Sequence, residues 1–182
     1  SEMLDQGVLD RGLIVAEGFD YELIDRVYRT HDNLGIVATL KADGTIEKDV
    51  VASVAEAIPL DADNEVAFAR LREIFMKDSL QMATFTITEK GYMLRDAGGN
   101  YRMDVWNDFE AGPLGARSYI GKVASLLYAR FLAGKKPIAM ISTDNCSHNG
   151  DKLYHAIAEF AYQWKDHHVA EAGFVDYIES EA

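Results

Sequence analysis

Apolar runs and polar breaks alternate along the first third of the chain. Residues 13–16 form a short apolar run that predicts a buried strand, and residues 34–40 predict a second one. The turn at 42–45 contains Asp-Gly, which supplies the positive φ of a tight hairpin. We therefore expect 46–57 to be the return strand, extending into a sheet edge or a short helix. Between the first two strands, 21–29 predicts a short helix or an irregular crossing.

Apolar residues three and four positions apart predict three amphipathic helices further along. Their apolar faces are Ala67, Leu71, Ile74 and Phe75; then Ile120, Val123, Ala124, Leu127 and Phe131; then Leu153, Ile157, Phe160 and Trp164. Asp61 or Asp63 is expected to cap the first helix, and Ser147 or Asn149 the third. Gly134 is placed to end the second.

Strand-like runs at 80–88 and 137–142 lie between these helices. Residues 96–100 predict a loop or hairpin tip, and 103–115 predict irregular structure. The second half then alternates helix, strand, helix, strand, helix, and its strands are nearly continuous apolar runs. That pattern is typical of a parallel sheet covered on both faces, so the predicted fold class is α/β, doubly wound in style.

Composition narrows the class of protein. The 182 residues suit one domain, and a hydrophobic content of 48% is enough for a core. Eighteen Lys and Arg against 30 Asp and Glu, a net charge of -12, argue against a nucleic-acid partner but not against a bound nucleotide. The single cysteine excludes an intrachain disulfide and fits a cytoplasmic location. No run approaches the roughly 18 apolar residues of a membrane span.

Two polar clusters follow the strands of the second half. Residues 86–92 read TITEKGY, and residues 143–150 read TDNCSHNG. Ligands of doubly wound sheets bind beyond the carboxyl ends of the strands. Two polar strand ends that share one crevice therefore predict a functional site.

Three interpretations of the second cluster remain open from the residues alone. Asp144, Cys146 and His148 have a spacing that can chelate a metal on a turn, although zinc sites with thiolate ligands usually draw on paired cysteines. An ordinary capped loop would use the same Asp and Asn side chains to satisfy the local backbone. A catalytic turn would use the Asn145 amide to hold a carbonyl oxygen that becomes an alkoxide, with Glu89 relaying protons or orienting a polyhydroxylated substrate.

Two further residues are weaker candidates. Glu17 ends the first apolar run, where an α/β nucleotide fold can bind a ribose hydroxyl, although a surface acid is the simpler interpretation. Lys90 could act as a general base only if it were desolvated. The sequence contains no G-x-G-x-x-G turn, which a dinucleotide enzyme of this type needs.

Residues 86–92 and 142–150 together resemble the mannitol dehydrogenase family of long-chain polyol dehydrogenases, which includes mannitol 2-dehydrogenase and fructuronate reductase (D-mannonate oxidoreductase). Residues 31–34, the strand after them and Asp43-Gly44 resemble the family's upstream hairpin. The resemblance covers most of the chain. It implies an incomplete Rossmann-like doubly wound sheet, mostly parallel, with a β-hairpin excursion. The implied activity is metal-free hydride transfer between NAD or NADP and a sugar alcohol or an aldonate/ketouronate.

The resemblance also implies roles for single residues. Asn145 matches the asparagine that holds the reacting oxygen, and Glu89 matches an acid near the proton path. Thr86 and Thr88 match positions beside the cofactor, and Ser142 is a further cofactor-binding candidate.

The family's glycine-rich loop is expected upstream of these motifs, and its Lys, Asn and His catalytic set downstream in a helical substrate domain. Residues 1–182 are therefore interpreted as a partial dinucleotide-binding domain without that loop and without the C-terminal domain. The chain alone is expected to be inactive. Many members carry a proline where this chain has Cys146, Ser147 and His148, which leaves the identity of the substrate open. The choice between NAD and NADP and the oligomeric state are also left open. A non-catalytic nucleotide-fold binding module and a metal-dependent hydrolase centred on residues 144–148 are the rival functions.

Overall fold

The computed structural model describes residues 2–182 of the chain. The chain divides into two compact units, Ser1–Phe68 and Ala69–Ala182. Each unit is described below by itself.

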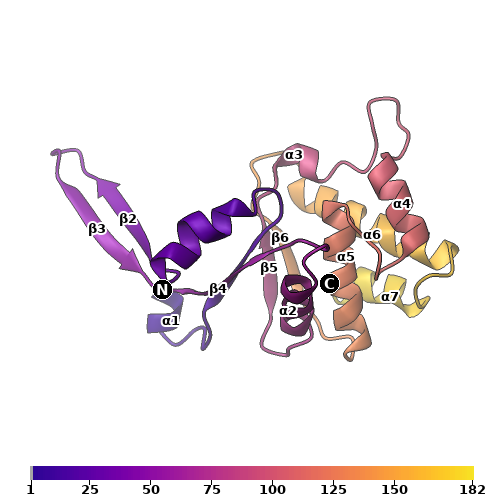
Figure 1. Ribbon diagram of the computed structural model, residues 1–182, viewed down its shortest axis with the longest axis horizontal. Helices are drawn as coiled ribbons and strands as arrows, with labels where there is room; N and C mark the ends of the chain where they lie inside the picture. Colours follow the sequence, from indigo (N-terminus) through magenta and orange to yellow (C-terminus); the bar gives the residue numbers. More distant parts are fainter. Residues whose placement is uncertain (1) are drawn as a thin grey trace. The chain divides into compact units, whose positions relative to one another are not determined.

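The first unit is built around two pairs of strands (Figure 1). Its elements are α1 (Glu2–Asp5), β1 (Leu13–Glu17), β2 (Gly35–Leu40), β3 (Ile46–Val51) and β4 (Val54–Pro59). β1 pairs with β4 in parallel, and β2 pairs with β3 antiparallel. The strands expected from 13–16 and 34–40 are confirmed. The crossing between them is a π-helical segment, Ile24–Tyr28, that runs into a single 3-10 turn, Arg29–His31.

The segment 46–57 is not one return strand, so that expectation was wrong. It divides at residues 52–53 into β3, which completes the hairpin, and β4, which leaves the hairpin and pairs with β1. Burial differs between the two pieces, because β3 is exposed along most of its length whereas β4 ends in the buried residues Ala57 and Ile58. The apolar pattern alone does not separate the two strands, because both contain isoleucine and valine.

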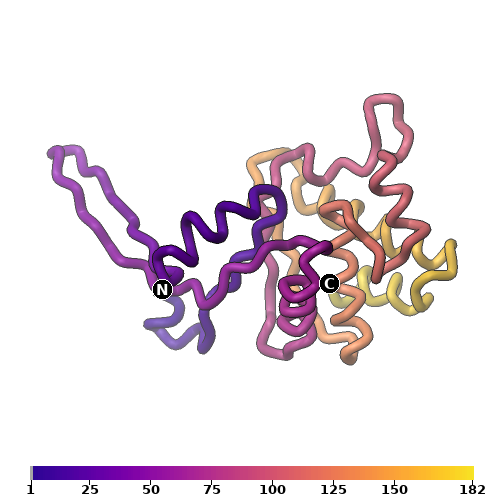
Figure 2. Tube along the Cα trace, viewed as in Figure 1, coloured from indigo at the N-terminus to yellow at the C-terminus, as the bar shows by residue number. Residues whose placement is uncertain are grey.

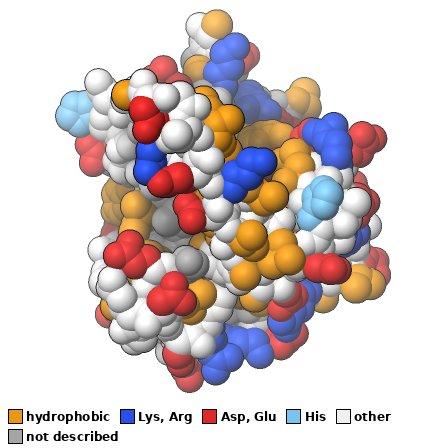
Figure 3. Space-filling view, turned by 90° about the vertical axis from the view of Figure 1, so that its left-hand side faces the viewer, with side chains coloured by type: hydrophobic (Ala, Val, Ile, Leu, Met, Phe, Trp, Pro, Cys, Tyr) orange, Lys and Arg blue, Asp and Glu red, His pale blue; other side chains and the backbone are white. Residues whose placement is uncertain are grey.

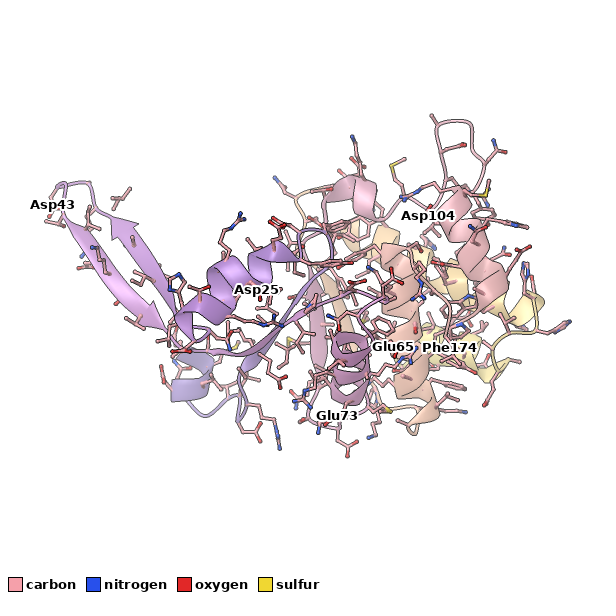
Figure 4. All side chains as sticks on the ribbon, in the orientation of Figure 1. Asp25, Asp43, Glu65, Glu73, Asp104 and Phe174 are labelled. Atoms are coloured by element: carbon pink, nitrogen blue, oxygen red, sulfur yellow. The ribbon has the colours of Figure 1, made fainter. Side chains whose placement is uncertain are left out.

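The β2–β3 hairpin has the turn that Asp-Gly predicts. Gly44 has a φ of +84°, and the Asp43 carboxylate at the tip accepts hydrogen bonds from Thr45 (Figure 4). Every residue of β2 is exposed, and the tube in Figure 2 extends away from the rest of its unit. The β-hairpin excursion that the resemblance implies is therefore present in this chain.

The second unit is mainly helical around one parallel pair of strands. Helix α2 (Glu65–Phe75) crosses the boundary between the units, and the elements after it are β5 (Met82–Phe85), α3 (Thr88–Gly91), α4 (Met103–Ala111), α5 (Tyr119–Leu132), β6 (Ala139–Ser142), α6 (Asn149–Asp166) and α7 (Gly173–Ser180). β5 pairs with β6 in parallel, with Phe85 opposite Ser142. The three helices and two strands expected from the periodicity are present. Helix α7 was not anticipated.

Residues 103–115 are not irregular throughout, because 103–111 form α4. Val105, Asp108 and Phe109 are its buried residues, and they follow helical spacing. A buried aspartate at one of these positions hid the apolar periodicity from sequence reasoning. The Asp108 carboxylate accepts hydrogen bonds from the backbone N–H groups of Arg117 and Ser118, at 2.8 and 2.7 Å, and so ties α4 to the start of α5.

Two expected helix caps were also wrong. Asn64, not Asp61 or Asp63, caps α2 by accepting a hydrogen bond from the N–H of residue 67 at 3.1 Å, because it directly precedes the helix. His148 stands at the N-cap position of α6 without a side-chain cap hydrogen bond. Asn149 already lies inside the helix, where its amide serves the neighbouring loop instead.

The core of the second unit is an aromatic cluster contributed by α4, α5, α6 and α7. Its fully buried members include Phe109, Phe160, Trp164 and Phe174. Phe174 is labelled in Figure 4. Helices α5, α6 and α7 lie to one side of β5–β6 in Figure 1, and α6 contacts β6. Met82 and Ile141 on this pair are 47% and 39% exposed. The predicted α/β fold class with mostly parallel strand pairs is confirmed.

Arg130 anchors both strands of the pair at their amino-terminal ends. Its guanidinium is buried and donates to five backbone carbonyls at 2.6 to 2.9 Å, those of Phe75, Lys77, Leu80, Lys136 and Pro137. Five donors in a planar fork suit such a ring of acceptors. One side chain thus holds the end of α2 and the approaches to β5 and β6.

At the surface, hydrophobic side chains lie between acidic and basic ones (Figure 3). Among the helices formed by residues 2–182, none has both the length and the apolar character needed to span a membrane.

Candidate active site

The two polar clusters meet where β5 and β6 end. Thr143 directly follows β6, and its N–H and hydroxyl both donate to the carbonyl of Phe85, at 2.8 and 2.9 Å. Its Oγ1 also lies 2.6 Å from Oγ1 of Thr86. Parallel strands bring both carboxyl ends to one edge. The juxtaposition predicted from the two motifs is therefore present.

Asp144 is the centre of this meeting point. Oδ2 accepts the N–H of Ile87 at 2.9 Å, and Oδ1 accepts the N–H of Thr88 at 3.0 Å. The hydroxyl of Tyr92 donates a further short hydrogen bond to Oδ2. These donors, with Tyr92 contributing most, lower the pKa of Asp144 below its ordinary value, because each stabilises the carboxylate.

Tyr92 completes the link from the other strand end. Its side chain is buried, and its hydroxyl lies 2.8 Å from Oγ of Ser142 as well as against Asp144. Burial, followed by the hydrogen bond to Asp144, raises the pKa of Tyr92 to about 12. The phenol is thus a fixed neutral donor at neutral pH.

Asn145 directly follows Asp144, whose backbone is also held by hydrogen bonds. The preceding carbonyl, that of Asp144, accepts the Asn149 amide at 2.6 Å, while the Asp144 N–H donates to Ser142 Oγ at 3.4 Å. The Asn145 side chain itself is exposed, and within residues 2–182 no hydrogen bond engages its amide. Its amide is therefore positioned at the carboxyl edge of the strands and available to an oxygen of a ligand.

Glu89 lies in the short helix α3, within the facing loop of residues 86–92, and is exposed. Its Oε1 receives the ammonium of Lys152, from the first turns of α6, at 2.5 Å. That hydrogen bond raises the pKa of Lys152, so this lysine stays protonated at neutral pH and cannot serve as a general base. Lys90 is exposed, so the desolvation that a catalytic base needs is not provided at that position.

Thr88 has a backbone conformation that β-branched residues rarely adopt. Its φ is +64°, in the left-handed region that favours glycine. Strain of this kind persists where surrounding contacts hold it, and it is frequent at functional sites. Here the contact is the hydrogen bond from the Thr88 N–H to Asp144.

The metal interpretation finds no support in this geometry. The Asp144 carboxylate accepts hydrogen bonds from three protein donors, so its oxygens are already occupied. Nδ1 of the exposed His148 lies 3.1 Å from Oδ2 of Asp151. In the part of the chain that the structure describes, no three His, Cys, Asp or Glu side chains gather closely enough to hold an ion. Cys146 is half-buried and free.

Glu17 belongs to the first unit. Its carboxylate accepts the N–H groups of Phe19 and Asp20, at 2.9 and 3.2 Å, and so closes the turn after β1. Glu17 therefore has a local structural role, and its assignment to the cofactor stays a prediction.

Sequence reasoning missed three contributors to the site. The motif TITEKGY contains Tyr92 but does not by itself indicate a role for it, and the position of Asn149 in the sequence predicts only a helix cap. Lys152 lies two residues beyond the second motif, on what the apolar pattern marks only as the polar face of a helix. A tyrosine at the end of a conspicuously polar motif was the one usable signal.

The fold is similar to about a third of two solved sugar-alcohol dehydrogenases. The structure matches mannitol 2-dehydrogenase of Pseudomonas fluorescens, solved as a ternary complex with NAD and D-mannitol, with a TM-score of 0.71 and 23% identity over 92% of this chain and 33% of that one. It matches substrate-free D-sorbitol dehydrogenase with a TM-score of 0.76 and 19% identity over 97% of this chain and 35% of that one.

The relatives found by sequence narrow the class further. D-mannonate oxidoreductase of Thermotoga maritima is 45% identical over 179 residues, 98% of this chain and 33% of the relative. Mannitol 2-dehydrogenase of Cereibacter sphaeroides is 29% identical over 84% of this chain and 34% of the relative. No family model matches the chain. The resemblance to the mannitol dehydrogenase family is confirmed, and the chain spans about a third of the length of these relatives.

Proposed function

We propose that this chain is part of an NAD(P)-dependent oxidoreductase that transfers a hydride between a nicotinamide and a secondary alcohol or ketone carbon of a sugar alcohol or aldonate. The observation that carries the proposal is the 45% identity to a D-mannonate oxidoreductase over nearly the whole chain. The 29% identity to a mannitol 2-dehydrogenase is lower, so an aldonate of the mannonate type is the favoured substrate.

In this function the chain forms part of the dinucleotide-binding domain. The residues present suit the sheet edge of such a domain, because exposed hydroxyls of Thr86, Thr88 and Thr143 lie at the carboxyl ends of parallel strands. Thr86 and Thr88 would lie beside the cofactor, with Ser142 behind them holding Tyr92. The bound nicotinamide would accept or supply the hydride.

Asn145 would hold the reacting oxygen. A neutral amide donates to a carbonyl oxygen and donates more strongly as negative charge develops on it, which lowers the barrier to hydride arrival. Glu89 would take part in the proton path or orient substrate hydroxyls. Because Lys152 is paired with it, the Glu89 carboxylate is held in place at the site entrance.

The test is turnover by the full-length protein encoded by the source gene. We expect NAD(P)-dependent oxidation of D-mannonate to exceed that of D-mannitol and D-arabinitol, and NAD to be compared with NADP in the same assay. Asn145→Ala is expected to lower kcat by about 10²–10³-fold while cofactor affinity holds. Cofactor binding without turnover of any of the three substrates would instead favour a non-catalytic binding module. A cytoplasmic location is part of the same proposal.

A further inference from the structure

The function proposed above leaves Asp144 without a task, although its carboxylate accepts three hydrogen bonds at the site. The side-chain partners of Asp144 are Ile87, Thr88 and Tyr92. All three come from residues 86–92, the loop after β5, which contains the short helix α3. The Asp144 carboxylate therefore faces protein donors, and it does not project into solvent as Asn145 does. This arrangement is typical of a side chain that holds parts of the protein together, not of one that binds a ligand.

Asp144 connects the two residues expected to meet the substrate. It directly precedes Asn145, and its own carbonyl and N–H are held by Asn149 and Ser142. On the opposite loop it holds Thr88, which directly precedes Glu89. One carboxylate thus sets the spacing between the loop that presents the amide and the loop that presents the acid.

The backbone of Thr88 shows that this tie sustains a costly conformation. A β-branched residue at a φ of +64° is strained, and such strain persists only where surrounding contacts hold the residue in place. The N–H of that same residue donates to Asp144. Release of the carboxylate would let Thr88 relax and carry Glu89 with it.

We infer that Asp144 is a positioning residue: its carboxylate locks the loop after β5 onto the loop after β6 and so fixes Asn145 and Glu89 relative to each other. The inference rests on the proposed hydride-transfer function. Asp144 touches neither substrate nor cofactor in this role. Displacement of a reacting group by about 1 Å can lower a rate by about 10²-fold, so the effect on turnover is measurable.

The variant that tests this role is Asp144→Asn in the full-length protein. An amide keeps the shape of the carboxylate but replaces one acceptor oxygen with a donor nitrogen. Oδ1 and Oδ2 each receive a backbone N–H, from Thr88 and Ile87, so either orientation of the amide loses one of these bonds. We expect kcat to fall about 10- to 100-fold in the folded variant. The matched control is Asp151→Asn, a side chain 70% exposed at the start of α6, which should leave kcat unchanged.

A double-mutant cycle separates positioning from mere stability. If Asp144 acts through Asn145, Asp144→Asn should lower kcat much less in an Asn145→Ala background than in the wild type. Equal fold-losses in the two backgrounds, or a folded Asp144→Asn protein with wild-type kcat, would overturn the inference. If Asp144→Asn does not fold, Tyr92→Phe decides, because it keeps the buried ring and removes one donor. A fall in its kcat supports the clamp, and wild-type kcat contradicts it.

Failure of the proposed function gives a different result. A full-length protein that turns over none of the three substrates removes the function itself. Turnover that is unaffected by Asn145→Ala removes the amide's role. Turnover that Asn145→Ala lowers and Asp144→Asn does not lower removes only the clamp.

Discussion

At the scale of single residues, the site depends on charges and hydrogen bonds that sequence neighbours cannot supply. The Asp144 carboxylate is stabilised by the Tyr92 hydroxyl and by the N–H groups of Ile87 and Thr88, all more than 50 positions away. Asp-Asn in a turn is common and by itself suggests only a local cap. The long-range donors make this aspartate a structural link between two loops.

The lowered pKa of Asp144 makes the link sensitive to acid. A carboxyl whose pKa is lower in the folded state contributes stability above its ordinary pKa of 3.8, and that stability is lost as the pH falls through the folded-state value. Asp144→Asn cannot ionise at this position. We therefore expect the difference in the free energy of unfolding between wild type and Asp144→Asn to shrink as the pH is lowered from neutrality through 3.8, measured by urea unfolding. A difference that stays constant with pH would contradict the assignment.

Alanine substitutions at two helical glycines should change the free energy of unfolding in opposite directions. A Cβ on Gly121 would lie 2.4 Å from Oδ2 of Asp108 and 2.8 Å from Oγ of Ser118, whereas a Cβ on Gly150 would meet nothing within 4 Å. Gly121→Ala should lower the free energy of unfolding by about 1–3 kcal/mol despite the better helix propensity of alanine. Gly150→Ala should raise it by up to ~1 kcal/mol. Thermal unfolding of both variants checks the pair, and the same sign for both would refute the packing at Gly121.

At the scale of elements, buried polar side chains join helices to strands that share no apolar pattern. Arg130 lies on α5 but satisfies carbonyls at the end of α2 and before β5 and β6. Helix ends leave such carbonyls without intrahelical partners. The Arg130 guanidinium therefore supplies the donors that separate capping groups would otherwise have to supply.

Removal of this guanidinium should be among the most destabilising changes in the second unit. Arg130→Ala leaves five buried or half-buried carbonyls without their donor, and Arg130→Lys cannot reach them all. We expect each to lower the free energy of unfolding, Arg130→Ala by at least ~3 kcal/mol. Arg102→Ala is the control, because its exposed pair with Asp104 should contribute about 0–1 kcal/mol. Comparable losses for the two alanine variants, seen in denaturant unfolding, would show that the Arg130 network contributes little.

The β2–β3 hairpin should tolerate substitution. Leu40 is 78% exposed whereas Leu71 on α2 is 1% exposed. Leu40→Ser is expected to change the free energy of unfolding by less than ~0.5 kcal/mol, and Leu71→Ala to lower it by about 2–5 kcal/mol. Urea unfolding of the two variants tests the contrast. A large loss for Leu40→Ser would mean that this hairpin face is covered in solution.

At the scale of the whole molecule, the proposed activity requires groups beyond those that residues 2–182 bring to the site. Lys152 is kept protonated by Glu89, and Lys90 is exposed, so neither lysine is suited to take the substrate proton. We predict that residues 1–182 expressed alone show no oxidation of D-mannonate with NAD or NADP, while the full-length protein does, in a nicotinamide absorbance assay. Robust turnover by the short chain would refute the interpretation as a partial domain.

Elements with strong periodicity and motifs with distinctive chemistry can be predicted from the amino-acid sequence. Apolar spacing located α5 and α6, Asp-Gly located the hairpin turn, and the motifs at 86–92 and 142–150 led to a resemblance that the relatives confirm. These features are local, so neighbouring residues carry the whole signal.

The roles of the polar residues follow from long-range contacts, which the folded chain alone shows. The tertiary structure divided 46–57 between two sheets, placed a helix at 103–111 around the buried Asp108, and turned Asp144 from a possible metal ligand into the clamp of two loops. In each case the deciding partner lies in a distant segment: β1 for β4, the start of α5 for Asp108, and the loop after β5 for Asp144. A buried polar group is stable only with its partners, and one sequence does not show which distant donors will meet it.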